Sequence, residues 1–148
     1  MGYDIVRLNE KGEPKQITDL ADSDYFRLNI WGMSRARKIA VWGAGKISNE
    51  EMMKEYSDGE PSSGGLQQML AAAAAIMTSA GTEDLPWGNA FCHNGEEHDR
   101  ETIEKFREGL QAGLDKLLMS PVRPDFDIDY LVEFSEYLRD SQHGVYVG

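Results

Sequence analysis

Apolar residues recur at helical spacing most clearly in the stretch that follows Asp99. The recurring residues are Ile103, Phe106, Leu110, Leu114, Leu117 and Leu118. Their spacing of three or four residues predicts an amphipathic helix, and Asp99 has a side chain suited to the N-cap. Two glycines four residues apart, Gly109 and Gly113, cost this helix about 1 kcal/mol each relative to alanine. They would also allow a neighbouring backbone to approach closely.

Three other stretches are predicted to be helical. Residues 66–80 are rich in alanine and carry one apolar face, and Gly81 ends the pattern. Residues 127–140 place Ile128, Leu131, Phe134 and Leu138 on one side, with Asp127 as the cap. Residues 49–57 form a shorter candidate with acidic residues in the first turn, where they favour a helix.

The stretch 28–44 allows two interpretations. As a helix it has one side made of Met33, Ala36, Ala40 and Gly43, with Gly45 as the glycine that ends it. Its other side is a stripe formed by Trp31, Arg35, Lys38 and Trp42. As a strand, the run KIAVWG would lead directly into a glycine turn.

Strand patterns lie near both ends of the chain. Residues 3–8 alternate well enough for a short strand, and residues 145–147 form a second candidate after Gly144. We expect these two strands to pair through Ile5 and Val6. Residues 82–98 are expected to form a long irregular loop with a turn at Asn94-Gly95. The predicted fold is therefore α+β: a mostly helical single domain, residues 1–148, with four or five helices and a small sheet made from the N- and C-terminal strands.

Length and composition limit the classes of protein that fit. A chain of 148 residues forms one domain with its own hydrophobic core. The single cysteine, Cys92, cannot form an internal disulfide, which favours a reducing, cytoplasmic setting. The longest apolar run covers only residues 69–77, too few to cross a bilayer, and no membrane association is expected.

Charge is separated along the chain. The formal net charge is −11, which makes nucleic acid an unlikely partner and suits a partner with a basic surface. Residues 25–49 contain no Asp or Glu, although the chain has 26 of them. The cations of this segment are Arg27, Arg35, Arg37, Lys38 and Lys46. Such separation marks a place where a group of opposite sign docks, either within the fold or from outside.

The sequence GAGK at residues 43–46 invites comparison with phosphate-binding loops. With Lys46 as the lysine of a P-loop, the first glycine would fall on Ala40 and the hydroxyl residue on Ile47, so that motif fails. A dinucleotide-binding turn would have Ser48 in place of its third glycine, and the rest of the chain has too few strand patterns for that fold. A helix ended by Gly45 is the better interpretation.

Two clusters invite a metal hypothesis. Cys92, His93 and His98 have no recognised zinc spacing, and the adjacent Cys92 and His93 are poorly placed to act as nucleophile and base. The acidic run at residues 125–129 lacks the glycine and the distal glutamate of a calcium loop. We therefore expect no metal ion, no cofactor and no catalytic residue. A metal-assisted hydrolase built on His93, Glu97 and His98 is the weakest alternative.

The tryptophan and cation stripe is the candidate binding site. Trp31 and Trp42 could stack on a ligand or partner while Arg35 and Lys38, with the nearby Arg27, neutralise an anion. In the structural alternative both tryptophans pack beneath neighbouring elements, and the cations reach out to the acidic helices of the same chain.

The segment YFRLNIWGM, residues 25–33, resembles one found in small uncharacterised bacterial and phage proteins. The matching positions are Tyr25, Phe26, Arg27, Asn29, Trp31, Gly32 and Met33, followed by Asn94-Gly95 and Gly144. The chain departs from that pattern at His143, where those proteins have a second glycine. The resemblance implies a helix after Met33 and no activity.

Together these features predict a non-enzymatic acidic protein-interaction module that acts on a basic partner surface. A phage or bacterial accessory protein would have this character. The alternative is a protein that binds a nucleotide or another small anion through the face formed by Trp31, Arg35, Lys38, Trp42 and Arg27.

Overall fold

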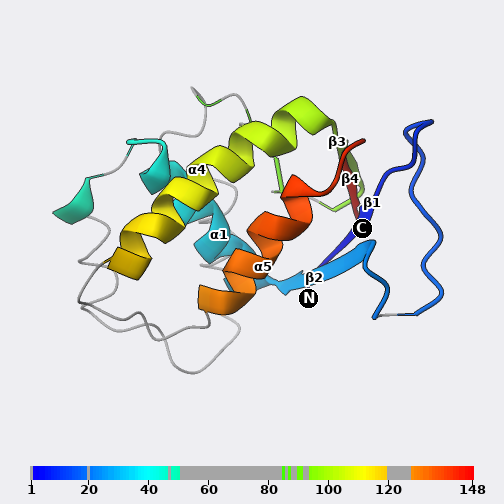
Figure 1. The fold of residues 1–148 in the computed structure, drawn as a ribbon, viewed down its shortest axis with the longest axis horizontal. Helices are drawn as coiled ribbons and strands as arrows, with labels where there is room; N and C mark the ends of the chain where they lie inside the picture. Colours follow the sequence, from blue (N-terminus) through cyan, green and yellow to red (C-terminus); the bar gives the residue numbers. More distant parts are fainter. Residues whose placement is uncertain are drawn as a thin grey trace.

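The computed structural model describes residues 2–19, 21–46, 48–50, 85, 87, 90, 91, 94–119 and 128–148, and of Trp31 it describes the backbone only. In chain order the elements are β1 (Gly2–Arg7), β2 (Tyr25–Asn29), α1 (Ile30–Gly43), β3 (Glu96–His98), α4 (Arg100–Met119), α5 (Ile128–Arg139) and β4 (Val145–Val147). Figure 1 shows the three helices gathered on one side and the strands on the other.

In the described part of the chain the sheet has four antiparallel strands in the order β2-β1-β4-β3. The predicted pairing of the terminal strands is confirmed, because Ile5 lies opposite Val147 and Val6 lies opposite Tyr146. Two strands were not predicted. β2 pairs along the other side of β1, and β3 occupies the end of the stretch that was expected to be an irregular loop.

The α+β class is confirmed, and the helix count needs a correction. The described residues hold three helices, whereas four or five were expected. The predicted helices at 49–57 and 66–80 fall largely or wholly outside the described residues. The helices predicted after Asp99 and in the stretch 127–140 are confirmed as α4 and α5. Asp99 caps α4 as expected, since its Oδ1 accepts a hydrogen bond from the Thr102 backbone N–H at 2.8 Å.

The ambiguous stretch is a helix with well-defined ends. Asn29 caps the start of α1, where its Oδ1 accepts from the Gly32 N–H at 2.7 Å. At the other end Gly45 has a φ of 78°, and its N–H donates to the Trp42 carbonyl at 3.0 Å. The Lys46 N–H donates to the Val41 carbonyl at 3.1 Å, which completes a Schellman motif. The GAGK sequence is therefore a helix terminus, in agreement with the prediction for Gly45.

Small residues bring α1 and α4 into backbone contact. A Cβ atom added to Gly109 would lie 2.6 Å from the Ala40 carbonyl oxygen, and one added to Gly113 would lie 2.4 Å from the Ile39 carbonyl oxygen. From the other side, a Cβ atom on Gly43 would lie 1.8 Å from the Gly109 carbonyl oxygen. The close approach expected from the glycine spacing is confirmed, and its partner is the positively charged helix α1.

The core lies between the helices and one face of the sheet. Ile5, Val145 and Val147 are fully buried there, and the side chains that alternate with them point to the opposite face. Phe91 and Phe106 pack with ring centroids 4.8 Å apart, and Phe134 approaches both rings. This arrangement leaves the outer surfaces of α4 and α5 and the far face of the sheet as the described surfaces to consider for function.

Candidate functional site

The predicted tryptophan and cation stripe is only partly a surface feature. Arg35 and Lys38 are partly exposed on α1, as expected, but Trp42 is only 3% exposed. The Trp42 indole N–H donates to Asn49 at 2.8 Å, and the Lys116 ammonium lies 5.0 Å from the centroid of its ring. Trp42 therefore belongs to the core, as the structural alternative proposed, and it does not offer a ring for stacking. The side chain of Trp31 lies outside the described residues.

Arg37 is a buried cation that sequence reasoning did not single out. Its side chain is fully buried and donates to the Ala90 carbonyl, with its guanidinium carbon 5.5 Å from the Trp87 ring centroid. Its neighbours on the apolar side of α1, Met33 and Ala36, are also fully buried. One of the cations of residues 25–49 is thus buried inside the fold.

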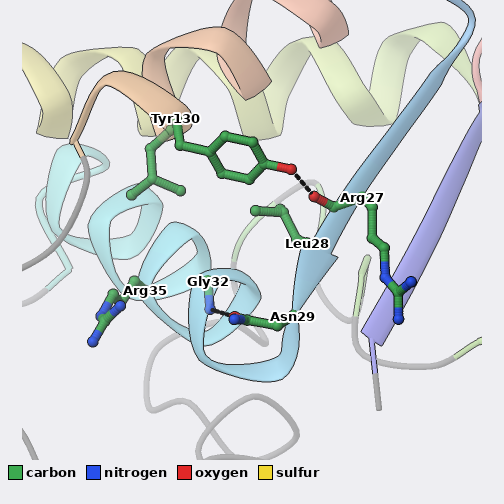
Figure 2. Close-up of a pocket in the computed structure, with 7 residues that line it drawn as sticks. Arg27, Leu28, Asn29, Gly32, Arg35 and Tyr130 are labelled. Carbon is green, nitrogen blue, oxygen red and sulfur yellow. Dashed lines mark hydrogen bonds between the residues drawn. The ribbon is translucent and has the colours of Figure 1, made fainter. Parts of the chain in front are cut away.

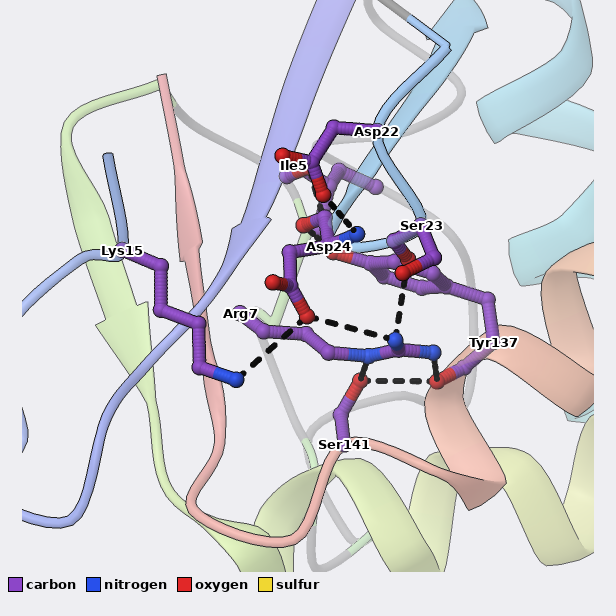
Figure 3. A network of polar contacts seen from close by, with 8 residues as sticks. All are labelled: Ile5, Arg7, Lys15, Asp22, Ser23, Asp24, Tyr137 and Ser141. Atoms are coloured by element: carbon purple, nitrogen blue, oxygen red, sulfur yellow. Dashed lines mark hydrogen bonds and ion pairs between the residues drawn. The ribbon is translucent and has the colours of Figure 1, made fainter. Parts of the chain in front are cut away.

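Arg7 is the centre of a polar network that joins the N-terminal strand to α5 (Figure 3). Its guanidinium donates to the carbonyls of Ser23 at 2.9 Å and Tyr137 at 3.1 Å, and to the Ser141 hydroxyl at 3.0 Å. It also forms an ion pair with Asp24 at 3.5 Å. The Tyr137 hydroxyl donates to the carbonyls of Ile5 and Asp24, and burial raises its pKa far above the ordinary value. This network ties three segments of the chain together.

Two arginines of α4 bind the backbone of α5 in the same way. Arg100 donates to the carbonyls of Leu138, Arg139 and Ser141 at 2.8–3.1 Å, so a cation occupies the C-terminal end of α5. Arg107 donates to the Ser135 carbonyl at 3.2 Å. Arg7, Arg37, Arg100 and Arg107 thus all direct their guanidinium groups to backbone carbonyls within the fold.

Carboxylates occupy the outer sides of the same two helices. The exposed acidic residues of α4 are Glu101, Glu104, Glu108 and Asp115. Those of α5 are Asp129, Glu133 and Glu136, and Asp140 directly follows the helix. On each helix they lie opposite the buried residues, and α4 and α5 pack side by side (Figure 1). We call these eight carboxylates the acidic face.

Cations near the acidic face neutralise it only in part. Exposed ion pairs join Arg100 to Glu104 at 3.8 Å, Lys105 to Glu108 at 3.9 Å and Arg139 to Asp140 at 3.0 Å. Pairs of this kind in contact with water are weak, so a partner's cations can replace them. The neighbouring Arg139 holds the pKa of Asp140 below its ordinary value, so this carboxylate stays charged at neutral pH.

A pocket of about 420 Å³ lies where β2, α1 and α5 meet. Two of the predicted binding residues, Arg27 and Arg35, line it together with Leu28 and Tyr130. Figure 2 shows the side chains of the two arginines extending away from Tyr130 and from one another. Arg27 forms an ion pair with Asp4 at 3.8 Å. The structure therefore brings Arg27 and Arg35 to one pocket without making their guanidinium groups converge on it.

The histidine cluster gives no metal site among the residues that the structure describes. No group of three or more His, Cys, Asp or Glu side chains lies close enough together there to hold a metal ion. His98 is buried, and its Nε2 accepts a hydrogen bond from the Phe91 N–H at 3.2 Å. Burial lowers the pKa of His98, which keeps the ring neutral. Cys92, His93 and residues 125–127 of the acidic run lie outside the described residues.

Comparison of the chain with protein-family models, curated proteins and solved structures finds no match. The resemblance of residues 25–33 to small bacterial and phage proteins therefore stays a prediction from short motifs. Within the described part of the chain, no helix has the length and apolar character needed to cross a membrane.

Proposed function

We propose that this protein is a non-enzymatic interaction domain that binds a basic protein surface through its acidic face. The observation that supports this proposal most strongly is the opposite orientation of the two kinds of charge. Four arginines donate inward to backbone carbonyls, whereas the carboxylates of α4 and α5 are exposed. Negative charge is therefore concentrated on the outer sides of α4 and α5, in a chain whose net charge is −11. An accessory role in a phage or bacterium, in a cytoplasmic setting, fits this size and charge.

Electrostatics also favours protein over nucleic acid as the partner. A strongly anionic surface repels phosphates, while it accelerates the encounter with clustered lysines and arginines. Such binding weakens as ionic strength rises, because salt screens exposed charges separated by more than about 8 Å under physiological conditions. A salt-dependent complex with a basic protein is therefore expected.

Charge reversal on the acidic face tests this proposal. The immobilised protein is incubated with a lysate of its source cells at about 50 mM and about 300 mM salt. The test variant carries Glu133→Lys and Glu136→Lys. The matched control carries Glu10→Lys and Glu13→Lys, which make the same charge change at exposed positions between β1 and β2.

We expect the wild type and the control to capture the same basic protein at low salt and to lose most of it at the higher salt. The test variant should fail to capture it under both conditions. Capture by the test variant at the wild-type level, or no captured protein at either salt concentration, would contradict the proposal.

A further inference from the structure

The face of the sheet that points away from the helices carries a row of side chains across all four strands. Tyr25 lies opposite Val6, Val6 lies opposite Tyr146, and Tyr146 lies opposite Glu97. Directly opposed residues of an antiparallel sheet point to the same face. The adjacent residue Ile5 is buried beneath the helices, so this row points the other way.

This far face is accessible and has an apolar centre. Tyr25, Val6 and Tyr146 are only partly buried, although they lie on paired strands. Arg27 is two residues from Tyr25 on β2, and Asp4 is two residues from Val6 on β1, so both point to the same face. Their side chains are 59% and 47% exposed. The described helices all lie on the opposite side of the sheet (Figure 1).

Opposite charges lie at the two edges of this face. Arg27 belongs to the edge strand β2, and the exposed Glu97 belongs to the edge strand β3. Within the chain Arg27 pairs with Asp4 at 3.8 Å, an exposed pair that another carboxylate can replace. The face has a cation at one edge and a carboxylate at the other, with Tyr25, Val6 and Tyr146 between them and Asp4 beside Arg27 on β1. Opposite charges at its two edges make the face complementary to itself.

We propose that the far face of the sheet binds a second copy of this chain in a two-fold symmetric dimer. The axis runs parallel to the strands and lies between the two sheets. Rotation about this axis lays β2 of one copy over β3 of the other, so Arg27 approaches Glu97 of the partner copy twice. It also places Val6 against Tyr146 of the partner copy. An axis perpendicular to the strands would lay β2 over β2 and β3 over β3, which brings like charges together along each edge, so the charges select the first arrangement.

The size of the face predicts a weak dimer. Four strands about 4.8 Å apart give a face about 19 Å wide. At a rise of about 3.3 Å per residue, its length is about 17–20 Å along β1 and β2 and only about 10 Å along the three-residue strands β3 and β4. Its area is smaller than the roughly 800 Å² per partner of a standard stable interface. The charge of −11 on each copy adds long-range repulsion, which moderate salt screens more effectively than it screens the close Arg27–Glu97 contacts. Moderate salt therefore strengthens the dimer, whereas it weakens a complex on the acidic face.

Sedimentation equilibrium with a charge swap tests this arrangement. The full chain is measured from about 10 µM to about 1 mM in about 150 mM salt. The variants are Arg27→Glu, Glu97→Arg and the double variant that exchanges the two charges. Lys11→Glu is the matched control, because it reverses an exposed charge on the β1–β2 connection. Circular dichroism checks that each variant folds.

We expect the wild type and the control to dimerise, each single reversal to weaken the dimer by about tenfold or more, and the double variant to restore it. A monomer across the whole concentration range would overturn the proposal. So would a dimer that either single reversal leaves unchanged, or a double variant that dimerises no better than the single ones. The acidic-face variant Glu133→Lys/Glu136→Lys should still dimerise, so the failure of one proposal can be told from the failure of the other.

Discussion

The contact between α1 and α4 predicts that replacing a glycine of α4 by alanine destabilises the protein, which is the reverse of the usual effect. Replacing glycine by alanine in an exposed helix interior stabilises a protein by about 1 kcal/mol. At Gly113 the added Cβ atom would lie 2.4 Å from the Ile39 carbonyl oxygen, whereas ordinary van der Waals contact begins near 3.4 Å. The opposing atom belongs to a helix backbone and cannot rotate away. The two helices would therefore have to separate by about 1 Å along this contact.

We expect Gly113→Ala to lower the free energy of unfolding by about 2 kcal/mol. This value combines an overpacking cost of about 3 kcal/mol with the gain of about 1 kcal/mol in helix propensity. Gly109→Ala, whose Cβ atom would lie 2.6 Å from the Ala40 carbonyl oxygen, should act in the same direction. The assay is urea denaturation followed by circular dichroism.

Ala112→Gly is the control, because it changes a partly exposed neighbour in the same helix. It should cost about 1 kcal/mol through propensity alone. If Gly113→Ala raised the unfolding free energy by a similar amount, the backbones of α1 and α4 would not be in contact and the reasoning would be refuted.

Three further predictions concern the polar contacts of the fold. Tyr137→Phe removes the hydroxyl that donates to the carbonyls of Ile5 and Asp24, and it should lower the free energy of unfolding by about 1–2 kcal/mol. Urea denaturation measures this change, and an unchanged midpoint would show that water replaces the hydroxyl. Asp99→Ala removes the cap of α4 and should cost about 1 kcal/mol, and equal stability would argue against that cap. His98 has a lowered pKa, so its unfolded form binds a proton more readily, and the wild type should lose stability as pH falls below about 6.5. In the variant His98→Gln this part of the pH dependence should vanish, and identical pH profiles for the two proteins would contradict the assignment.

Features with a local chemical signal were predictable from the sequence. Asp99 before an apolar repeat identified the start of α4, and Gly45 identified the end of α1, because caps depend on only a few neighbouring residues. The spacing of Gly109 and Gly113 indicated a close backbone contact correctly. Even the pairing of the terminal strands followed from their alternation, since few other strand patterns competed for partners.

Features that depend on the assembled fold were not predictable. β2 passes directly into α1, and Asn29 is both the last residue of the strand and the cap of the helix, so no turn signal separates them. β3 is a short polar strand whose extended conformation depends on its pairing with β4 and not on its own sequence. The position of Trp42 on a helix stripe with Arg35 and Lys38 left two alternatives, a binding face or a tryptophan packed beneath neighbouring elements, and the assembled fold shows that the second holds for Trp42. Likewise, nothing in the spacing of Arg37 showed that the Ala90 carbonyl would receive its guanidinium.

Carboxyl footprinting of the free protein and of its complex with the captured partner tests the central claim most directly. A carbodiimide and an amine label accessible carboxylates, and mass spectrometry measures the extent at each residue. The acidic face predicts that the partner protects Glu133 and Glu136 while Glu10 and Glu13 are labelled equally in both states. Protection at Glu10 and Glu13 with unchanged labelling on α4 and α5 would contradict it.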